Sequence, residues 1–218
     1  MNRIYPAIMG IDQDGLQKLK MLQGLCSRVH IDSMDNVFVP NGTQGEDRID
    51  EAAEMYGFLP WIHLMVQLPL PFYQRLVLPI GSIVSFHIES QVDIGEMINV
   101  IKEKKHQVSI AMCPKTPLEE LVPYIHLVDQ VLVMSVEPGF SEQSFLSEVI
   151  QKIDSLVKYR QKSGYMFRIA VDGGINKDTI ENLASKGVDD FAVSNGIFGQ
   201  KDPVAALREL RELVGEAE

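Results

Sequence analysis

Two histidines and two aspartates are spaced along the chain so that they could share one metal ion. His30 and Asp32 are two residues apart in an extended run, so their side chains leave the same face of one strand. His63 lies in the third of eight such runs, and Asp172 ends the seventh. Imidazole nitrogens and carboxylate oxygens suit Zn²⁺, Fe²⁺, Mn²⁺ or Co²⁺, whereas Mg²⁺ and Ca²⁺ prefer shells made of oxygen alone. We therefore expect one divalent ion of the first group.

The two aspartates indicate a reaction as well as a metal site. Two carboxylates on opposite sides of a bound ketose can each reach one face of the carbon beside its carbonyl. One carboxylate removes the proton and the other returns a proton on the far side, which inverts that centre. A metal ion stabilises the negative charge of the enediolate that forms between the two steps. This chemistry needs no organic cofactor, and we expect none.

The residues that could do chemistry lie on short β-rich runs that alternate with helical patterns from end to end. Most runs are continuously apolar, as the strands of a parallel sheet covered on both faces must be. The runs are 4–9, 28–32, 61–66, 83–88, 107–112, 130–136, 168–172 and 190–194. Eight strands alternating with helical stretches predict an α/β fold, a single-domain (β/α)8 TIM barrel over residues 1–218. An open dinucleotide-binding sheet would show a glycine fingerprint after the first strand, and that fingerprint is missing.

Helical spacing is clearest at 145–161 and at 203–214. The second of these segments opens with proline after Asp202, which we expect to cap its first turn. Pro69 and Pro71 interrupt the segment after the third strand, where they could open a short helix. These segments supply the outer layer that a closed barrel requires.

Catalytic residues of such barrels lie at the carboxyl ends of the strands. That rule places His30, Asp32, His63 and Asp172 at one mouth, where buried charges must be paired or bind a metal. His87 also ends a strand, but it has no carboxylate at a matching spacing, and we assign it no role. The remaining histidines, His106 and His126, are expected at the surface or at helix ends.

Composition excludes several classes of protein. The chain has 218 residues, 45% of them hydrophobic and 23% charged, which suits a globular domain. Its net charge of −10 leaves no basic patch for nucleic acid. Cys26 and Cys113 are too few for a disulfide framework, and no apolar run approaches the ~18 residues of a membrane span. We expect a cytoplasmic protein that binds neither nucleic acid nor membrane.

Six stretches of the sequence resemble motifs of the ribulose-phosphate 3-epimerase family. They are 30–41 (HxDxMDGxFVPN in the family), 63–66 (HLMV), 86–89 (FHxE), 114–119 (PxTPLE), 133–145 (MSVxPGFGGQxF) and 171–176 (VDGGIN). The resemblance runs in order along nearly the whole chain. It implies a barrel of the ribulose-phosphate-binding type, a sugar-phosphate substrate, a place in the pentose phosphate pathway and a homo-oligomer.

The resemblance also implies roles for individual residues. His30, Asp32, His63 and Asp172 would hold the metal, and the two aspartates would be the catalytic acid–base pair. The implied substrate-binding residues are Met34, Met65, Met134, Gly139, Gly173, Gly174, Ser194 and Asn195. The methionines would shield the enediolate from water.

Three departures from the family pattern fall where substrate would be held. Gly10 stands where the family usually has a serine after the first strand. Ser141 and Glu142 replace a double glycine of the phosphate loop, where a glutamate would repel phosphate unless it pointed to solvent. Ser194 and Asn195 replace a Gly-Ser turn, although their backbone N–H groups can still face an anion.

These departures leave the substrate open. The first interpretation is a 3-epimerase that converts D-ribulose 5-phosphate into D-xylulose 5-phosphate. The alternative is a 3-epimerase of another ketose phosphate, such as allulose 6-phosphate. A barrel lyase would want a lysine among the strand-end carboxylates, and none stands there. A barrel that only binds a sugar phosphate has no need of two opposed carboxylates.

Overall fold

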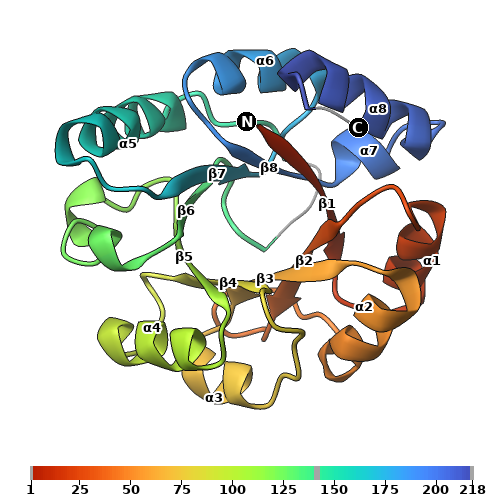
Figure 1. The fold of residues 1–218 in the computed structure, drawn as a ribbon, viewed down its shortest axis with the longest axis horizontal. Helices are drawn as coiled ribbons and strands as arrows, with labels where there is room; N and C mark the ends of the chain where they lie inside the picture. Colours follow the sequence, from red (N-terminus) through yellow and green to blue (C-terminus); the bar gives the residue numbers. More distant parts are fainter. Residues whose placement is uncertain (1, 140–142, 217–218) are drawn as a thin grey trace.

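The computed structural model describes residues 2–139 and 143–216. In these ranges eight parallel strands close into one barrel in chain order, with β8 pairing back to β1. Figure 1 looks along the barrel, with the strands around the centre and the helices outside. The strands are β1 (Arg3–Met9), β2 (Arg28–Met34), β3 (Leu59–Met65), β4 (Ile83–His87), β5 (Gln107–Met112), β6 (Gln130–Met134), β7 (Arg168–Asp172) and β8 (Asp190–Val193). The predicted TIM barrel is confirmed.

The outer layer consists of α-helices and three short 3-10 helices. They are α1 (Gln13–Met21), η1 (Glu46–Arg48), α2 (Ile49–Tyr56), α3 (Pro69–Gln74), α4 (Ile94–Glu103), η2 (Leu118–Glu120), η3 (Ile125–Leu127), α5 (Val149–Ser163), α6 (Lys177–Ser185), α7 (Asn195–Phe198) and α8 (Pro203–Val214). Asp202 caps α8 by accepting from two backbone N–H groups, and Pro69 opens α3, as the sequence predicted. None of the helices in the described ranges is long and apolar enough to cross a membrane.

Two outer segments differ from the pattern that the sequence predicted. The crossover from β5 to β6 contains η2 and η3 rather than an α-helix, since Pro114, Pro117 and Pro123 lack the N–H groups that a helix needs. The helix expected from residue 145 begins at Val149, because the backbone N–H of Leu146 bonds to Ser135 instead. Both differences lie in the connections, and the order of the strands is unaffected.

Strand register sets the height of each inward side chain. His30 on β2 is level with Trp61 on β3, and two residues later Asp32 is level with His63. On the far side of the barrel Met134 of β6 is level with Asp172 of β7. Because side chains alternate along a strand, these residues form successive layers inside the barrel.

A small inner core forms the floor beneath the mouth. Trp61 is fully buried there, and its indole N–H donates to the hydroxyl of Ser85 at 2.7 Å. Alanines on the other strands leave room for this large ring; the inner core consists of Tyr5, Ala7, Trp61, Ile83, Ala111, Leu132, Met134, Ala170 and Ala192. The ring of His30 stands edge-on to Trp61, with centroids 4.4 Å apart. The floor therefore supports the first histidine of the site.

Asn36 and Gly10 are two of the positions at the mouth that have left-handed backbone. Asn36, where the family motif has glycine, has φ +60°, a conformation that asparagine tolerates better than most residues. Gly10 has φ +68°, and an added Cβ would lie 2.6 Å from the carbonyl oxygen of Gln44. A serine cannot stand at position 10 unless the segment that contains Gln44 moves. Glycine at position 10, in place of the family's usual serine, is therefore compatible with the path of the loop that contains Gln44 in this chain.

We predict that Gly10→Ala lowers the free energy of unfolding by at least about 2 kcal/mol, because left-handed strain and crowding against Gln44 add. Gly24→Ala is the matched control: Gly24 has φ +77°, but nothing lies within 4 Å of an added Cβ. That variant should lose only the strain, about 1–2 kcal/mol. Urea unfolding measures both values. Equal losses of unfolding free energy in the two variants would show that the close approach of Gln44 to position 10 adds no destabilisation.

Candidate metal centre and active site

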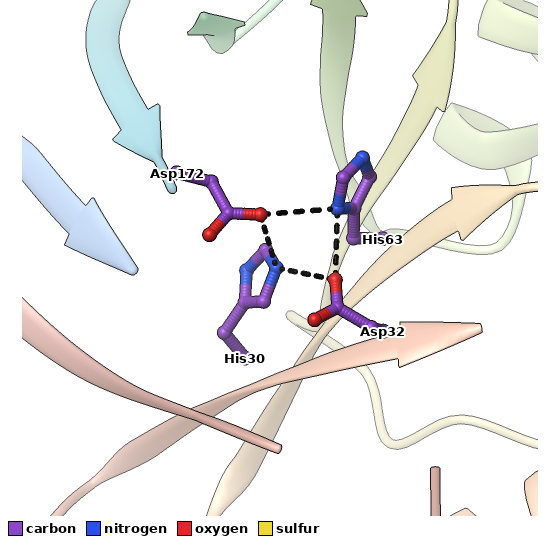
Figure 2. A group of neighbouring side chains, drawn as sticks. All are labelled: His30, Asp32, His63 and Asp172. Atoms are coloured by element: carbon purple, nitrogen blue, oxygen red, sulfur yellow. Dashed lines mark hydrogen bonds and ion pairs between the residues drawn. The ribbon is translucent and has the colours of Figure 1, made fainter. Parts of the chain in front are cut away.

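Four side chains converge at the mouth of the barrel, as Figure 2 shows. His30 and Asp32 come from β2, His63 from β3, and Asp172 from the end of β7. His30 Nε2 lies 3.2 Å from Asp32 Oδ1 and 3.6 Å from Asp172 Oδ2. His63 Nδ1 lies 3.0 Å and 3.5 Å from the same two oxygens. Nitrogen and oxygen atoms therefore alternate around one central point.

These four atoms fit a divalent transition-metal ion. Tetrahedral ligands about 2.0–2.1 Å from zinc lie about 3.3–3.4 Å from one another. The four N···O distances run from 3.0 to 3.6 Å and bracket that spacing. Both imidazoles are fully buried and both aspartate side chains are 14% exposed. A nearly dry pair of carboxylates requires compensating positive charge, which an ion would supply.

The four groups also stabilise one another's charged forms. Burial disfavours the charged imidazole of His30, yet Asp32 and Asp172 raise its pKa to about 9. Burial likewise opposes charge on His63, but its hydrogen bonds with Asp172 and Asp32 raise its pKa. Burial would raise the pKa of each aspartate, and the two imidazoles outweigh it and lower both values. Protons and a metal ion therefore compete for the two imidazole nitrogens that face the aspartates, His30 Nε2 and His63 Nδ1.

The turn after β7 is tied to the neighbouring strand, which fixes the backbone of Asp172. The backbone N–H of Ser135 donates to the carbonyl oxygen of Asp172 at 2.8 Å. The hydroxyl of Ser135 lies 2.9 Å from the same oxygen and 2.5 Å from that of Gly173. Gly173 has φ +110°, and an added Cβ would lie 2.4 Å from Val136. Only glycine fits this turn, so the carboxylate of Asp172 is held against the site.

A second polar chain lies behind His63. His63 Nε2 is 2.9 Å from His87 Nε2, and His87 Nδ1 is 3.0 Å from Glu89 Oε2. The other carboxylate oxygen of Glu89 accepts from the Cys113 N–H at 2.8 Å and from the Thr116 hydroxyl. Burial raises the pKa of Glu89, but the hydrogen bonds from His87, Thr116 and Cys113 prevail and lower it to about 2.

The expectation that His87 has no carboxylate at a matching spacing was therefore wrong. The residue is fully buried and bonds to both His63 and Glu89. The signal was present in the sequence, because His87 and Glu89 repeat the two-residue spacing of His30 and Asp32.

His106 lies at the carboxyl end of α4, as expected, where its backbone N–H bonds to the carbonyl of Ile101. It is 7% exposed rather than at the surface, and its Nδ1 lies 2.7 Å from the Tyr73 hydroxyl. It directly precedes β5, at the end of the barrel opposite the mouth, so it takes no part in the site. His126 is exposed in η3, as expected.

A cavity of about 580 Å³ opens above Asp32 and Asp172. It brings together every residue that the family resemblance implied for substrate binding: Met34, Met65, Met134, Gly139, Gly173, Gly174, Ser194 and Asn195. Their roles stay predictions, but their common location is a fact of the fold. Ser141 and Glu142, expected in the phosphate loop, lie outside the described residues.

The cavity also contains residues that sequence reasoning missed. Met9 at the end of β1 adds a fourth methionine to its wall, and Ser144 also lines it. Thr179 on α6 and Gln200 after α7 line it as well. Met9 could have been found from the strand-end rule, and Ser144 from the loop motif. Nothing in the spacing of Thr179 or Gln200 marks them, because they belong to the helical layer.

The chain matches the family model described as "Ribulose-phosphate 3 epimerase family" over residues 3–198. It is 37% identical to the ribulose-phosphate 3-epimerase of Serratia marcescens, covering 91% of this chain and 96% of that one. It is 31% identical to the enzyme of that name from Aquifex aeolicus, covering 98% and 97%. Among solved structures, a 3-hexulose-6-phosphate synthase superposes with a TM-score of 0.69 at 13% identity, covering 97% and 99%. That last likeness concerns the fold alone.

The competition between protons and metal gives a testable pH dependence. With a pKa raised from 6.5 to about 9, His30 carries a proton at pH 7, and Zn²⁺ binding must displace it. We predict at least one proton released per zinc at pH 7, and a zinc affinity that rises with pH until about 9. Calorimetry in buffers of different ionisation enthalpy counts the protons. A release of none, with a flat affinity between pH 6.5 and 9, would contradict this charge arrangement.

Proposed function

The chain belongs to the ribulose-phosphate 3-epimerase family, and we propose that this isomerase converts D-ribulose 5-phosphate into D-xylulose 5-phosphate by inverting C3. The observation that carries the proposal is the convergence of Asp32 and Asp172 on two histidines at the floor of the cavity. The catalytic and metal-binding roles of these four residues are part of the proposal.

The two aspartates come from different sides of the mouth. Asp32 belongs to β2 and Asp172 to β7, and both line the cavity. A ketose phosphate lying between them would present one face of C3 to each carboxylate. One aspartate takes the C3 proton, and the other delivers a proton to the opposite face. Each aspartate is the base in one direction of the reaction and the acid in the other.

The donor set favours zinc, iron, manganese or cobalt, bound by His30, Asp32, His63 and Asp172. When bound, the ion supplies electrostatic stabilisation for the negative charge that develops on the substrate oxygens. The protein's own part is to hold the two carboxylates apart and in fixed orientation. The two imidazoles lower the pKa of each aspartate, so the carboxylate that acts as the base is ionised near neutral pH.

Methionines form the apolar wall of the cavity. Met34 on β2 is level with Met65 on β3, one layer above Asp32. Both are at most 5% exposed, and Met134 beside Asp172 is 2% exposed. Such a wall keeps water from the carbanionic carbon, so that the returning proton comes from an aspartate. Polarisable thioethers suit this contact with a flat, electron-rich intermediate.

We place the phosphate at the ends of β7 and β8. Gly173 and Gly174 follow β7, and Ser194 and Asn195 follow β8, all on one side of the cavity. Barrels of this class commonly hold phosphate on the loops after these two strands. Ser144 adds a hydroxyl-bearing side chain to the same cavity.

The remaining expectations are also part of the proposal. We propose that the chain forms one barrel domain, needs no organic cofactor and acts as a homo-oligomer in the cytoplasm. The closed barrel of the described residues supports the first point, and the two-base chemistry supports the second. Family membership supports the last two.

Solvent exchange tests the reaction directly. We predict that the zinc-loaded protein, incubated with D-ribulose 5-phosphate in D2O, yields D-xylulose 5-phosphate deuterated at C3. Proton NMR at C3 follows both epimers over time. Exchange and inversion on allulose 6-phosphate alone would transfer the proposal to that hexulose. A zinc-loaded protein that exchanges neither substrate would refute an epimerase of either kind.

Single-aspartate variants test the two-base scheme. Asp32→Asn and Asp172→Asn each keep an oxygen for the metal but lack one base, so each should lower kcat at least about 100-fold. Each should still exchange the C3 proton of one epimer, and the two variants should differ in which epimer that is. His63→Ala is the control for metal loss and should exchange neither. Full turnover in either aspartate variant would falsify the assignment of two bases.

A further inference from the structure

The contact between the Nε2 atoms of His63 and His87 requires a single proton between the two nitrogens. Their Nε2 atoms lie 2.9 Å apart, so one nitrogen must donate and the other must accept. Both rings are fully buried, so water cannot take the place of either partner. The proton on this contact therefore fixes the tautomer of both rings at once.

The inference rests on the proposed function, because metal binding at His63 decides which ring donates. His63 faces the two aspartates through Nδ1, and a ligand nitrogen cannot carry a proton. The proton of His63 is then on Nε2, from which it is donated to His87 Nε2. Neutral His87 must carry its own proton on Nδ1, and that atom lies 3.0 Å from Glu89 Oε2.

We propose that His87 and Glu89 are positioning residues that hold His63 in the tautomer and orientation needed for metal binding through Nδ1. Glu89 is itself fixed, because its second oxygen accepts from the Cys113 N–H and the Thr116 hydroxyl. The order of donation runs from His63 to His87 to Glu89, away from the mouth. Outer hydrogen bonds of this kind typically change metal affinity 10–100-fold.

A different role for the same cluster is a second metal site, since His87, Glu89 and Cys113 lie close enough to surround an ion. That role conflicts with the first site. An ion at His87 Nδ1 would leave the proton of His87 on Nε2, where it would face the proton on His63 Nε2 across 2.9 Å. The two sites exclude each other.

His30 provides an internal contrast. Its outer nitrogen, Nδ1, is buried and has no hydrogen-bond partner among the residues that the structure describes. Its ring is oriented instead by the edge contact with Trp61. Removing His87 should therefore disturb one of the two histidines and leave the other in place.

The test compares His87→Gln with His87→Leu. A glutamine can accept from the His63 N–H and donate to Glu89, whereas leucine offers neither group at a similar size. We expect His87→Leu to weaken Zn²⁺ binding 10–100-fold in competition with a chelator, and His87→Gln to recover most of that loss. Equal affinity in the wild type and both variants would overturn the proposal. A loss of equal size in both variants would also overturn it, since it would reflect packing alone.

Cys113→Ser is the control for the second metal site. The proposal expects one zinc per chain, unchanged in number and affinity in this variant. Two zinc ions in the wild type and one in Cys113→Ser would overturn it. A wild type that binds no zinc at all would instead sink the proposed function, so the two failures are distinguishable.

A measurement on the unmodified protein avoids any doubt about folding of the variants. Nitrogen-15 NMR of the zinc-loaded protein reports which nitrogen of each imidazole carries the proton. We expect protons on Nε2 of His63 and on Nδ1 of His87, with a coupling between the two Nε2 atoms across the hydrogen bond. The opposite tautomers, or no proton shared between the rings, would overturn the proposal.

Discussion

Two carboxylates that share a nearly dry site repel each other, and the mouth of this barrel is arranged around that repulsion. Asp32 and Asp172 sit on strands whose hydrogen bonds fix their separation, so the side chains cannot simply move apart. The two imidazoles stand between them, each close to both carboxylates. Positive charge is therefore a structural requirement here, whether protons or an ion provide it.

Successive layers along the barrel axis contain different kinds of residue. Trp61 and small alanines pack at the height of His30. Asp32 and His63 form the next layer, and Met34 and Met65 lie above them. Close packing below supports the ionisable groups, and the apolar wall above borders the cavity. Loops contribute only at the top, where the substrate would be gripped. This separation lets the loops diverge, as at Gly10 and Asn195, while the charged layer keeps its family pattern.

The residues predicted from the sequence were those whose positions follow from a single strand. His30 and Asp32 share a face because of their spacing, and the strand-end rule placed Asp172 at the same mouth. The contact of His63 with His87 was not predictable, because it depends on how two rings on neighbouring strands are turned. Neither was the approach of Gln44 to Gly10, which depends on the path of a loop. Local periodicity predicts where the strands lie and which face each side chain is on. It does not predict how a side chain is rotated or which path a loop takes.

The left-handed turn at Gly10 constrains how this chain can change. Because the backbone of Gln44 occupies the space that a serine side chain would need, substitution at position 10 depends on the path of the loop that contains Gln44. A lineage moving toward the family's usual serine would have to shift the Gln44 segment first and substitute position 10 second. The reverse order passes through an intermediate with a damaged mouth. Grafting the family's serine alone into this barrel would therefore fail, whereas exchanging it together with the whole loop around Gln44 could succeed.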